Sequence, residues 1–161
     1  MHTDQITELL EKNARYSTAE IAALTGLDEA AVAERIEELE KTGAILGYHA
    51  IIDPELASAE RVTAFIEVKL VPERDGGFDR MALRISKFEQ VRSCYLMSGG
   101  YDLVVIVDGR SLQDVANFVA EKLSALEGVT STSTHFHLKT YKQDGFLAHG
   151  DAEPARLPVS P

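Results

Sequence analysis

The sequence contains one cysteine and lacks any long apolar run. Cys94 is the single cysteine, which excludes an internal disulfide bond and a cysteine-rich metal site. It lies in a strand-like apolar stretch, so we expect a buried, inert thiol rather than a catalytic nucleophile. No stretch approaches the roughly 18 apolar residues of a membrane span, and the first residues lack the charged-then-apolar pattern of a leader. We therefore expect a cytoplasmic protein with no membrane partner.

Signatures of catalysis are also missing from the sequence. The chain has no glycine-rich phosphate loop, no Ser-His-Asp or Cys-His constellation at a recognisable spacing, and no paired carboxylates in an apolar setting. His135 and His137 flank Phe136, so on a strand both imidazoles project to the same side and could share an ion. No third ligand is near in the sequence, which favours contact with solvent or a second subunit. We expect that the protein is not an enzyme and has no metal or cofactor.

Basic residues are scarce in the first 60 positions. Four basic side chains stand against thirteen acidic ones there, a net charge of −9, whereas the remaining residues carry −1. Phosphate neutralisation supplies most of the affinity in ordinary DNA binding. A segment this acidic should therefore bind nonspecific duplex poorly.

The same acidic segment has the layout of a helix-turn-helix. A first helix is predicted from Thr18 to Leu24 and stops at Gly26; a second follows Leu27, with Asp28 as its N-cap, and ends at Gly43. In a DNA reader, the outer face of the second helix enters the major groove. The candidate DNA-contacting residues are Tyr16, Ser17, Thr18, Asp28, Glu29, Ala31, Glu34, Arg35 and Glu38.

The outer face of this second helix is acidic, where base and phosphate contacts usually need Arg, Lys, Ser, Asn or Gln. Arg35 is basic, but it could pair with Glu38 one helical turn further on rather than with a phosphate. An acidic helix face favours a solvated surface over a docking site. The hydroxyls of residues 16–18 and the amides at the helix start could still contact phosphates, and an oligomer would add avidity.

Beyond residue 60 the apolar pattern alternates between strand and helix periods. Strands are predicted over residues 61–71, 91–97, 103–107 and 129–141, and helices over residues 78–88 and 112–126. This order is the split β-α-β arrangement of a ferredoxin-like fold, with both helices on one face of a four-stranded antiparallel sheet. The other face is then left for a second copy of the chain to cover.

We therefore predict an α+β protein in four segments. They are a helix-turn-helix domain (1–44), a strand-like connector (45–60), a ferredoxin-like βαββαβ domain for effector binding and oligomerisation (61–142), and a frayed, proline-containing tail (143–161).

A set of positions is spread over both halves of the chain. No single one is decisive, but their joint order and spacing form a specific pattern. In the first half they are Ile21-Ala22, Leu27, Val32, Arg35-Ile36, Leu39-Glu40, Gly43, Ile45, Gly47-Tyr48 and Asp53-Pro54. In the second half they are Val91, Gly99, Tyr101-Asp102, Gly128-Val129, Thr134 and Lys142. From about residue 6 to residue 142, the chain resembles the Lrp/AsnC family, the feast/famine transcriptional regulators.

The resemblance implies a DNA-binding domain joined to a ligand-sensing domain that dimerises through its sheets, with dimers often forming octamers. It also implies a small effector, usually an amino acid, beside the turn between the second and third sheet strands. Carried over by position, the effector-binding residues are Gly99, Gly100, Tyr101, Asp102, Thr132 and Thr134. Glycines let backbone amides approach a carboxylate, and Asp102 could accept from an ammonium. The same glycines also suit an ordinary hairpin, which needs positive φ.

Three functions fit these patterns. The favoured one is a transcriptional regulator that binds DNA and responds to an amino acid. The second is a ligand-sensing or partner-binding oligomer that has lost DNA binding because its reader helix is acidic. The third is an enzyme like the sirohaem decarboxylases, which are similar to this family in both domains.

Overall fold

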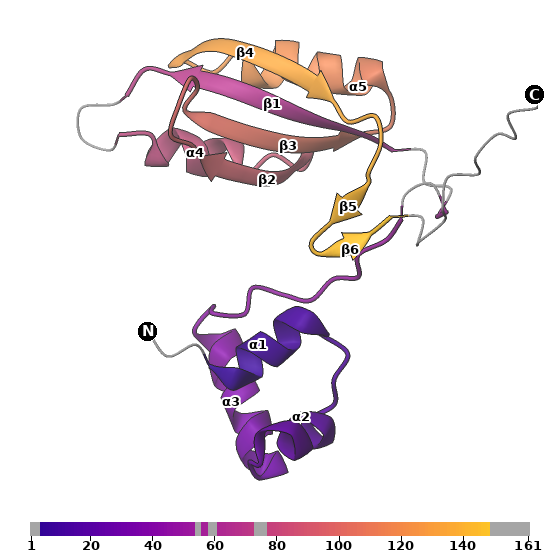
Figure 1. Ribbon diagram of the computed structural model, residues 1–161. Helices are drawn as coiled ribbons and strands as arrows, with labels where there is room; N and C mark the ends of the chain where they lie inside the picture. Colours follow the sequence, from indigo (N-terminus) through magenta and orange to yellow (C-terminus); the bar gives the residue numbers. More distant parts are fainter. Residues whose placement is uncertain (1–3, 54–55, 58–60, 73–76, 149–161) are drawn as a thin grey trace, which may run out of the picture. The chain divides into compact units, whose positions relative to one another are not determined.

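The structure is a computed structural model that describes residues 4–53, 56–57, 61–72 and 77–148. The chain divides into two compact units, residues 1–51 and residues 52–161 (Figure 1). No helix among the described residues is long and apolar enough to cross a membrane.

The N-terminal unit consists of three helices around a small apolar core. They are α1 (Gln5–Lys12), α2 (Thr18–Thr25) and α3 (Glu29–Lys41). Ile6, Ile21 and Val32 contribute one buried side chain from each helix. Each helix starts at a side-chain N-cap that accepts a first-turn amide: Asp4, Ser17 and Asp28.

A short turn separates α2 from α3, as the sequence predicts. Gly26 ends α2 with a left-handed backbone (φ 74°), and its amide donates to the carbonyl of Ala22. A side chain at this φ would be strained, which is why the helix ends at a glycine. The predicted helix-turn-helix is confirmed, with α2 one residue longer than expected and α3 ending at Lys41, just before Gly43.

The C-terminal unit is built on a four-stranded antiparallel sheet with spatial order β2-β3-β1-β4. Its strands are β1 (Val62–Leu70), β2 (Val91–Leu96), β3 (Leu103–Gly109) and β4 (Val129–Phe136). Its helices are α4 (Asp79–Ile85) and α5 (Leu112–Asn117), the latter continued by the π-helix η1 (Phe118–Leu123). The chain order β1-α4-β2-β3-α5-β4 confirms the predicted ferredoxin-like fold.

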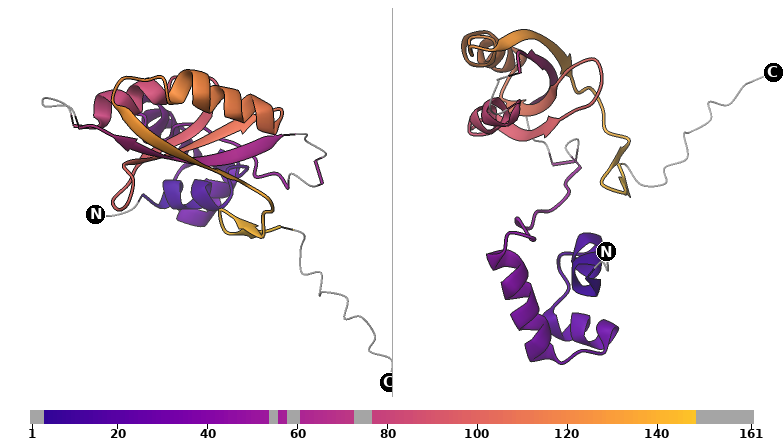
Figure 2. Two further views of the ribbon diagram at one scale, coloured as in Figure 1. Left: turned by 90° about the horizontal axis from the view of Figure 1, so that it is seen from above. Right: turned by 90° about the vertical axis from the view of Figure 1, so that its left-hand side faces the viewer.

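Both helices lie on one side of this sheet (Figure 2). Alternate residues of β1, among them Ala64, Ile66 and Val68, are fully buried against them, together with Ile85 of α4 and Leu123 of η1. The intervening β1 residues, such as Phe65, point to the opposite side, where the described residues of this unit form no helix. We call this uncovered side the open face.

Three local features differ from the sequence expectations. The expected strand-like connector forms no strand over residues 45–53, where it has no partner strand and Leu46 is 96% exposed. The last sheet strand ends at Phe136 rather than at Tyr141. Where a tail was expected from Gln143, strands β5 (Lys142–Gln143) and β6 (Phe146–Leu147) pair as a small hairpin.

The physical reason for the hairpin is the dipeptide between its strands. Asp144 and Gly145 both have positive φ, 47° and 91°, as the tightest hairpin turns require, and Asp-Gly is a strong signal for such turns. Residues 149–161, with the three tail prolines, lie outside the described residues, as do Pro54, Asp75 and Gly76.

Candidate functional site

The outer face of α3 carries four of the nine predicted DNA-contacting residues. Val32 and Leu39 bury the inner face of the helix. On the outer side, a hollow of about 460 Å³ is lined by Ala31, Glu34, Arg35, Glu37, Glu38 and Lys41. Lys41 Nζ lies 2.6 Å from Glu37 Oε1, so this cation is already paired within the helix. The structure thus gathers Ala31, Glu34, Arg35 and Glu38 on one surface.

Arg35 is held by two carboxylates on two different helices. Its Nε donates to Asp4 Oδ2 at 2.7 Å, and its Nη1 donates to Glu38 Oε2 at 2.5 Å. The hydrogen bond from Arg35 lowers the pKa of Asp4, and the hydrogen bond to Asp4 is the main cause that raises the pKa of Arg35. The pairing with Glu38 agrees with the sequence analysis. The contact between Asp4 and Arg35 was not predicted, because 31 residues separate the two in the sequence.

The other predicted DNA contacts also have partners inside this unit. Ser17 and Glu20 form a reciprocal capping box, which also lowers the pKa of Glu20. Thr18 Oγ1 donates to Glu29 Oε1 at 2.8 Å, and this bond links the start of α2 to the start of α3. Tyr16 is half-buried against the small core. Asp28 accepts from the Ala30 amide at 2.9 Å as the N-cap of α3.

The predicted effector turn joins β2 to β3 at one end of the sheet. Asp102 Oδ2 accepts from the Leu70 amide at 2.7 Å, and the Asp102 amide donates to the carbonyl of Val68. Asp102 therefore ties the turn to the end of β1. Gly99 has φ 139°, which bears out its role in turn geometry, whereas Gly100 has no positive φ and open space where a Cβ would be.

The two predicted threonines lie on β4 and point away from the open face. Thr132 pairs with Val68 and Thr134 with Ile66 in the sheet register, so both are on the helix-covered side. Thr132 Oγ1 lies 3.3 Å from Ser124 Oγ, just after η1. Tyr101, in contrast, lines a hollow on the open face. One copy of the chain therefore does not bring the six predicted effector residues into a single pocket.

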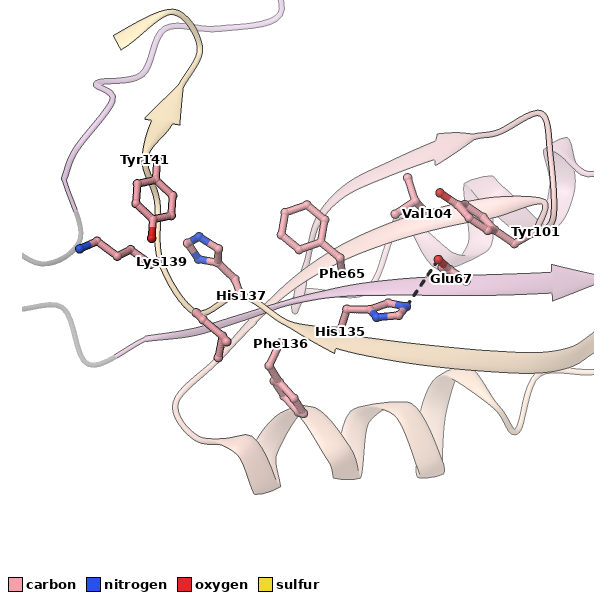
Figure 3. A pocket seen from close by; sticks show the side chains of 10 residues that line it. Phe65, Glu67, Tyr101, Val104, His135, Phe136, His137, Lys139 and Tyr141 are labelled. Atoms are coloured by element: carbon pink, nitrogen blue, oxygen red, sulfur yellow. Dashed lines mark ion pairs between the residues drawn. The ribbon is translucent and has the colours of Figure 1, made fainter. Parts of the chain in front are cut away.

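This second hollow, of about 510 Å³, lies over β1 and β4 on the open face (Figure 3). Phe65 lines it near the middle, and His135 Nε2 is 3.5 Å from Glu67 Oε1. Figure 3 shows Phe136 on the other side of the strands, toward the helix. The alternation of β1 and β4 was a signal for this surface, but the register that places His135 beside Phe65 came only with the structure.

The histidines and the cysteine have ordinary surroundings. His135 also lies 3.3 Å from Ser133 Oγ, and His137 Nε2 lies 3.1 Å from Thr140 Oγ1, so each ring has its own neighbour. No group of three or more His, Cys, Asp or Glu that could hold a metal ion occurs among the residues the structure describes. Cys94 is half-buried, and burial raises the pKa of its thiol, which keeps it in the unreactive protonated form.

Comparison with known proteins places both units in one family. The family model for the AsnC-type helix-turn-helix domain matches residues 5–40, and the model for the Lrp/AsnC ligand binding domain matches residues 63–147. The chain belongs to the Lrp/AsnC family: it is a helix-turn-helix transcriptional regulator with a ligand-binding domain.

Its relatives are similar over nearly their whole length. An uncharacterized HTH-type transcriptional regulator of Bacillus subtilis, YugG, is 46% identical over 98% of this chain and 95% of its own length. The crystal structure of the leucine response regulatory protein LrpA of Mycobacterium tuberculosis has a TM-score of 0.71 and 26% identity, over 89% of this chain and 95% of that one.

A relative solved with a small molecule shares the same architecture. The transcriptional regulator NMB0573 of Neisseria meningitidis, in its L-Met complex, has a TM-score of 0.63 and 26% identity over 86% of this chain and 89% of that one. The leucine-responsive regulatory protein of Haemophilus influenzae is 29% identical over 89% of this chain and 86% of its length. Both relatives are named as regulatory proteins.

Proposed function

We propose that this regulator is controlled by an amino acid that binds at the turn 99–102. The observation that carries the proposal is Gly100, whose side-chain position is open space and whose backbone φ does not demand glycine. A bare backbone of this kind lets a ligand carboxylate approach main-chain amides closely. A relative in the same family is named as an L-Met complex, which supports this class of effector.

The remaining groups at the turn can serve the other end of an amino acid. Asp102 uses Oδ2 to hold Leu70, and its carboxylate retains acceptor capacity for an ammonium group. Thr132 and Thr134 lie on β4, which is an edge strand of the sheet. Because these groups lie on different faces of one copy, we propose that neighbouring copies complete the site between them.

A gel-shift assay tests the DNA and effector roles together. The purified protein is titrated with fragments of DNA from upstream of its own coding region, first without and then with each of the 20 amino acids. We expect saturable, sequence-selective binding that at least one amino acid shifts severalfold. Gly100→Val should abolish that shift without changing DNA binding, whereas Ser98→Val, at an exposed neighbour in the same turn, should retain it. A response of Gly100→Val equal to wild type would contradict this site.

We also propose that the open face joins two copies of the chain. Phe65 at its centre is 38% exposed although it lies on a central strand, and an exposed apolar surface of a sheet marks an interaction site. Phe65→Lys should raise the dissociation constant of the oligomer at least about a hundredfold, because the lysine charge would be buried at the interface without a partner. Leu83→Lys, at a 64% exposed position on α4, is the control, and analytical ultracentrifugation is the measurement.

A partner-binding oligomer without DNA is the second candidate. It is favoured by the charge of −9 in residues 1–60 and by the internal pairing of Arg35, Ser17 and Thr18. No DNA binding even at low salt would support it over the first proposal. For the enzyme alternative, we propose that the chain has no catalytic activity; a spectral change on adding sirohaem would contradict this.

A further inference from the structure

Two cations lie on the outer face of α3 in the described structure. Lys41 pairs within the helix, whereas Arg35 also pairs with Asp4, which lies outside it. Asp4 uses both of its oxygens: Oδ1 accepts from the Ile6 amide at 3.0 Å and Oδ2 accepts from Arg35 Nε at 2.7 Å. Glu38 accepts from Nη1. Two anchors on separate nitrogens restrict rotation of a planar guanidinium, which a single anchor would not.

This arrangement leaves one part of the guanidinium unused. Nη2 has no protein partner among the described residues, and the Arg35 side chain is 40% exposed. Nη2 and the second Nη1 hydrogen therefore remain as donors that these two contacts do not use. A fixed pair of donors is the requirement for bidentate readout of guanine O6 and N7 in the major groove.

The charge of the cluster argues against a phosphate contact. Asp4, Arg35 and Glu38 together carry −1, and Glu34, exposed on the same helix, adds a further negative charge. A phosphate would be attracted weakly or repelled by this group. A neutral base edge meets no such penalty, and the donors of Arg35 keep their hydrogen-bonding capacity.

We propose that Asp4 and Glu38 are positioning residues that hold Arg35 as a base-reading side chain matched to guanine, and that they keep it from acting as a phosphate contact. The proposal rests on the DNA-binding function and specifies how an acidic reader helix obtains selectivity. Selectivity here comes from a donor fixed before binding, so less ordering of the side chain is needed when the complex forms.

Three single-charge variants separate orientation from charge. Asp4→Asn removes the ion pair but keeps an N-cap acceptor, since Asn caps helices as well as Asp. Glu38→Gln removes the charge of the second anchor, within α3, and weakens its hold on Nη1. Glu37→Gln is the matched control, because it removes the same charge from the same helix but its partner is Lys41 rather than Arg35. Thermal melting of each variant checks that the fold is retained.

The measured quantity is the dissociation constant for DNA at several salt concentrations. Two duplexes are compared: one that wild type selects from a random-sequence library, and a scrambled version of it. Each guanine of the selected duplex is also replaced in turn by 7-deazaguanine, which lacks the N7 acceptor. We expect one replacement to weaken wild-type binding at least about fivefold and to have no effect on Arg35→Ala. Asp4→Asn and Glu38→Gln should lose most of this sensitivity.

Salt dependence gives a second, independent readout. If Arg35 is released, it can neutralise one phosphate, so Asp4→Asn and Glu38→Gln should steepen the slope of log K against log salt by about 0.9 and bind scrambled DNA more tightly. Glu37→Gln should bind both duplexes slightly more tightly, with unchanged discrimination. Equal behaviour of all three variants, or equal 7-deazaguanine profiles for wild type and Arg35→Ala, would overturn the proposal. Failure of wild type to select any sequence would overturn the DNA-binding function as well.

Discussion

The two units of this regulator are stabilised by different physical means. Among the described residues, the N-terminal unit has three buried side chains in one core cluster, one from each helix, and its polar groups form caps and ion pairs. The described part of the C-terminal unit has thirteen buried residues in its core cluster, between the sheet and its helices. The two units also differ in formal charge, −6 for residues 1–51 against −4 for the longer segment 52–161.

The difference shows where each unit has unused binding capacity. In the N-terminal unit, the side chains of Arg35, Ser17 and Thr18 each donate to a nearby carboxylate, so a ligand at these groups must compete with the pairs or use the donors that they leave. In the C-terminal unit, the described helices cover one side of the sheet, and the open face keeps a hollow lined by Phe65 and by residues of the segment 137–141. We expect the first unit to act through directed hydrogen bonds and the second through apolar area.

The largest effect should come from the core of the C-terminal unit. Ile66→Ala removes a fully buried side chain and should lower the free energy of unfolding of this unit by about 2–5 kcal/mol. Protection of the α2 and α3 amides against hydrogen exchange should be unchanged. Leu83→Ala, at an exposed position, should change stability by less than about 0.5 kcal/mol. A loss of protection in both units would show that they unfold together and would contradict the view that each is stabilised separately.

A smaller effect on the free energy of unfolding is expected from Asp102, a polar side chain in the C-terminal unit. Asp102→Ala leaves the Leu70 amide without its 2.7 Å acceptor and should cost about 1–3 kcal/mol. Asp102→Asn keeps an oxygen acceptor and should cost less. Urea unfolding followed by circular dichroism measures both variants. Equal stability of wild type and Asp102→Ala would show that this carboxylate does not support the turn, which would leave effector binding as its role.

Removing one helix cap from each unit compares them directly. Ser17 caps α2 and Ser111 caps α5, each by accepting a first-turn amide. Either Ser→Ala change should cost about 1 kcal/mol. Because the N-terminal unit has the smaller core, Ser17→Ala should open its helices to hydrogen exchange about fivefold faster across the whole unit, and Ser111→Ala only near α5. The reverse pattern would contradict the assignment of stability to caps in the first unit.

The smallest expected effect is the dependence of stability on pH through the Asp4–Arg35 pair. Arg35 lowers the pKa of Asp4 in the folded protein, so the contribution of this pair is present above the ordinary aspartate pKa and is lost as the pH falls through the lowered value. The melting temperature of wild type should exceed that of Asp4→Asn at pH 7, and this difference should begin to shrink below about pH 4 and be lost as the pH falls through the lowered pKa of Asp4. A difference that persists at pH 2 would show that the ion pair is not its source.

Much of the fold could be predicted because local patterns and tertiary structure agree. The alternation of β1, the helical spacing in α3 and the glycine at position 26 each follow from short stretches of sequence. The hairpin at residues 142–147 was not predicted, although its Asp-Gly dipeptide is a local signal. The connector was predicted as a strand from its apolar composition, but a strand also needs a partner for its backbone, and residues 45–53 have none in the structure.

The candidate sites depended more on contacts between distant residues. Arg35 and Glu38 are one helical turn apart, so their pairing was expected, whereas the contact with Asp4 requires the packing of α1 against the other helices. The six effector residues were chosen by family position, and that assignment stays a prediction. The structure adds that Thr132 and Tyr101 lie on opposite faces of the sheet in one copy.

The sequence by itself determined the order of the elements in the helix-turn-helix and in the four-stranded domain, the division into helices and sheet, the acidity of the first unit and the family. These properties depend on the spacing of apolar side chains, on glycine positions and on charge, all of which can be read along the chain. Only the tertiary structure decided which carboxylates hold Arg35, which side of the sheet carries His135, and that Asp102 holds the end of β1. These contacts join residues far apart in sequence, and their geometry is set by packing and strand register rather than by local preference.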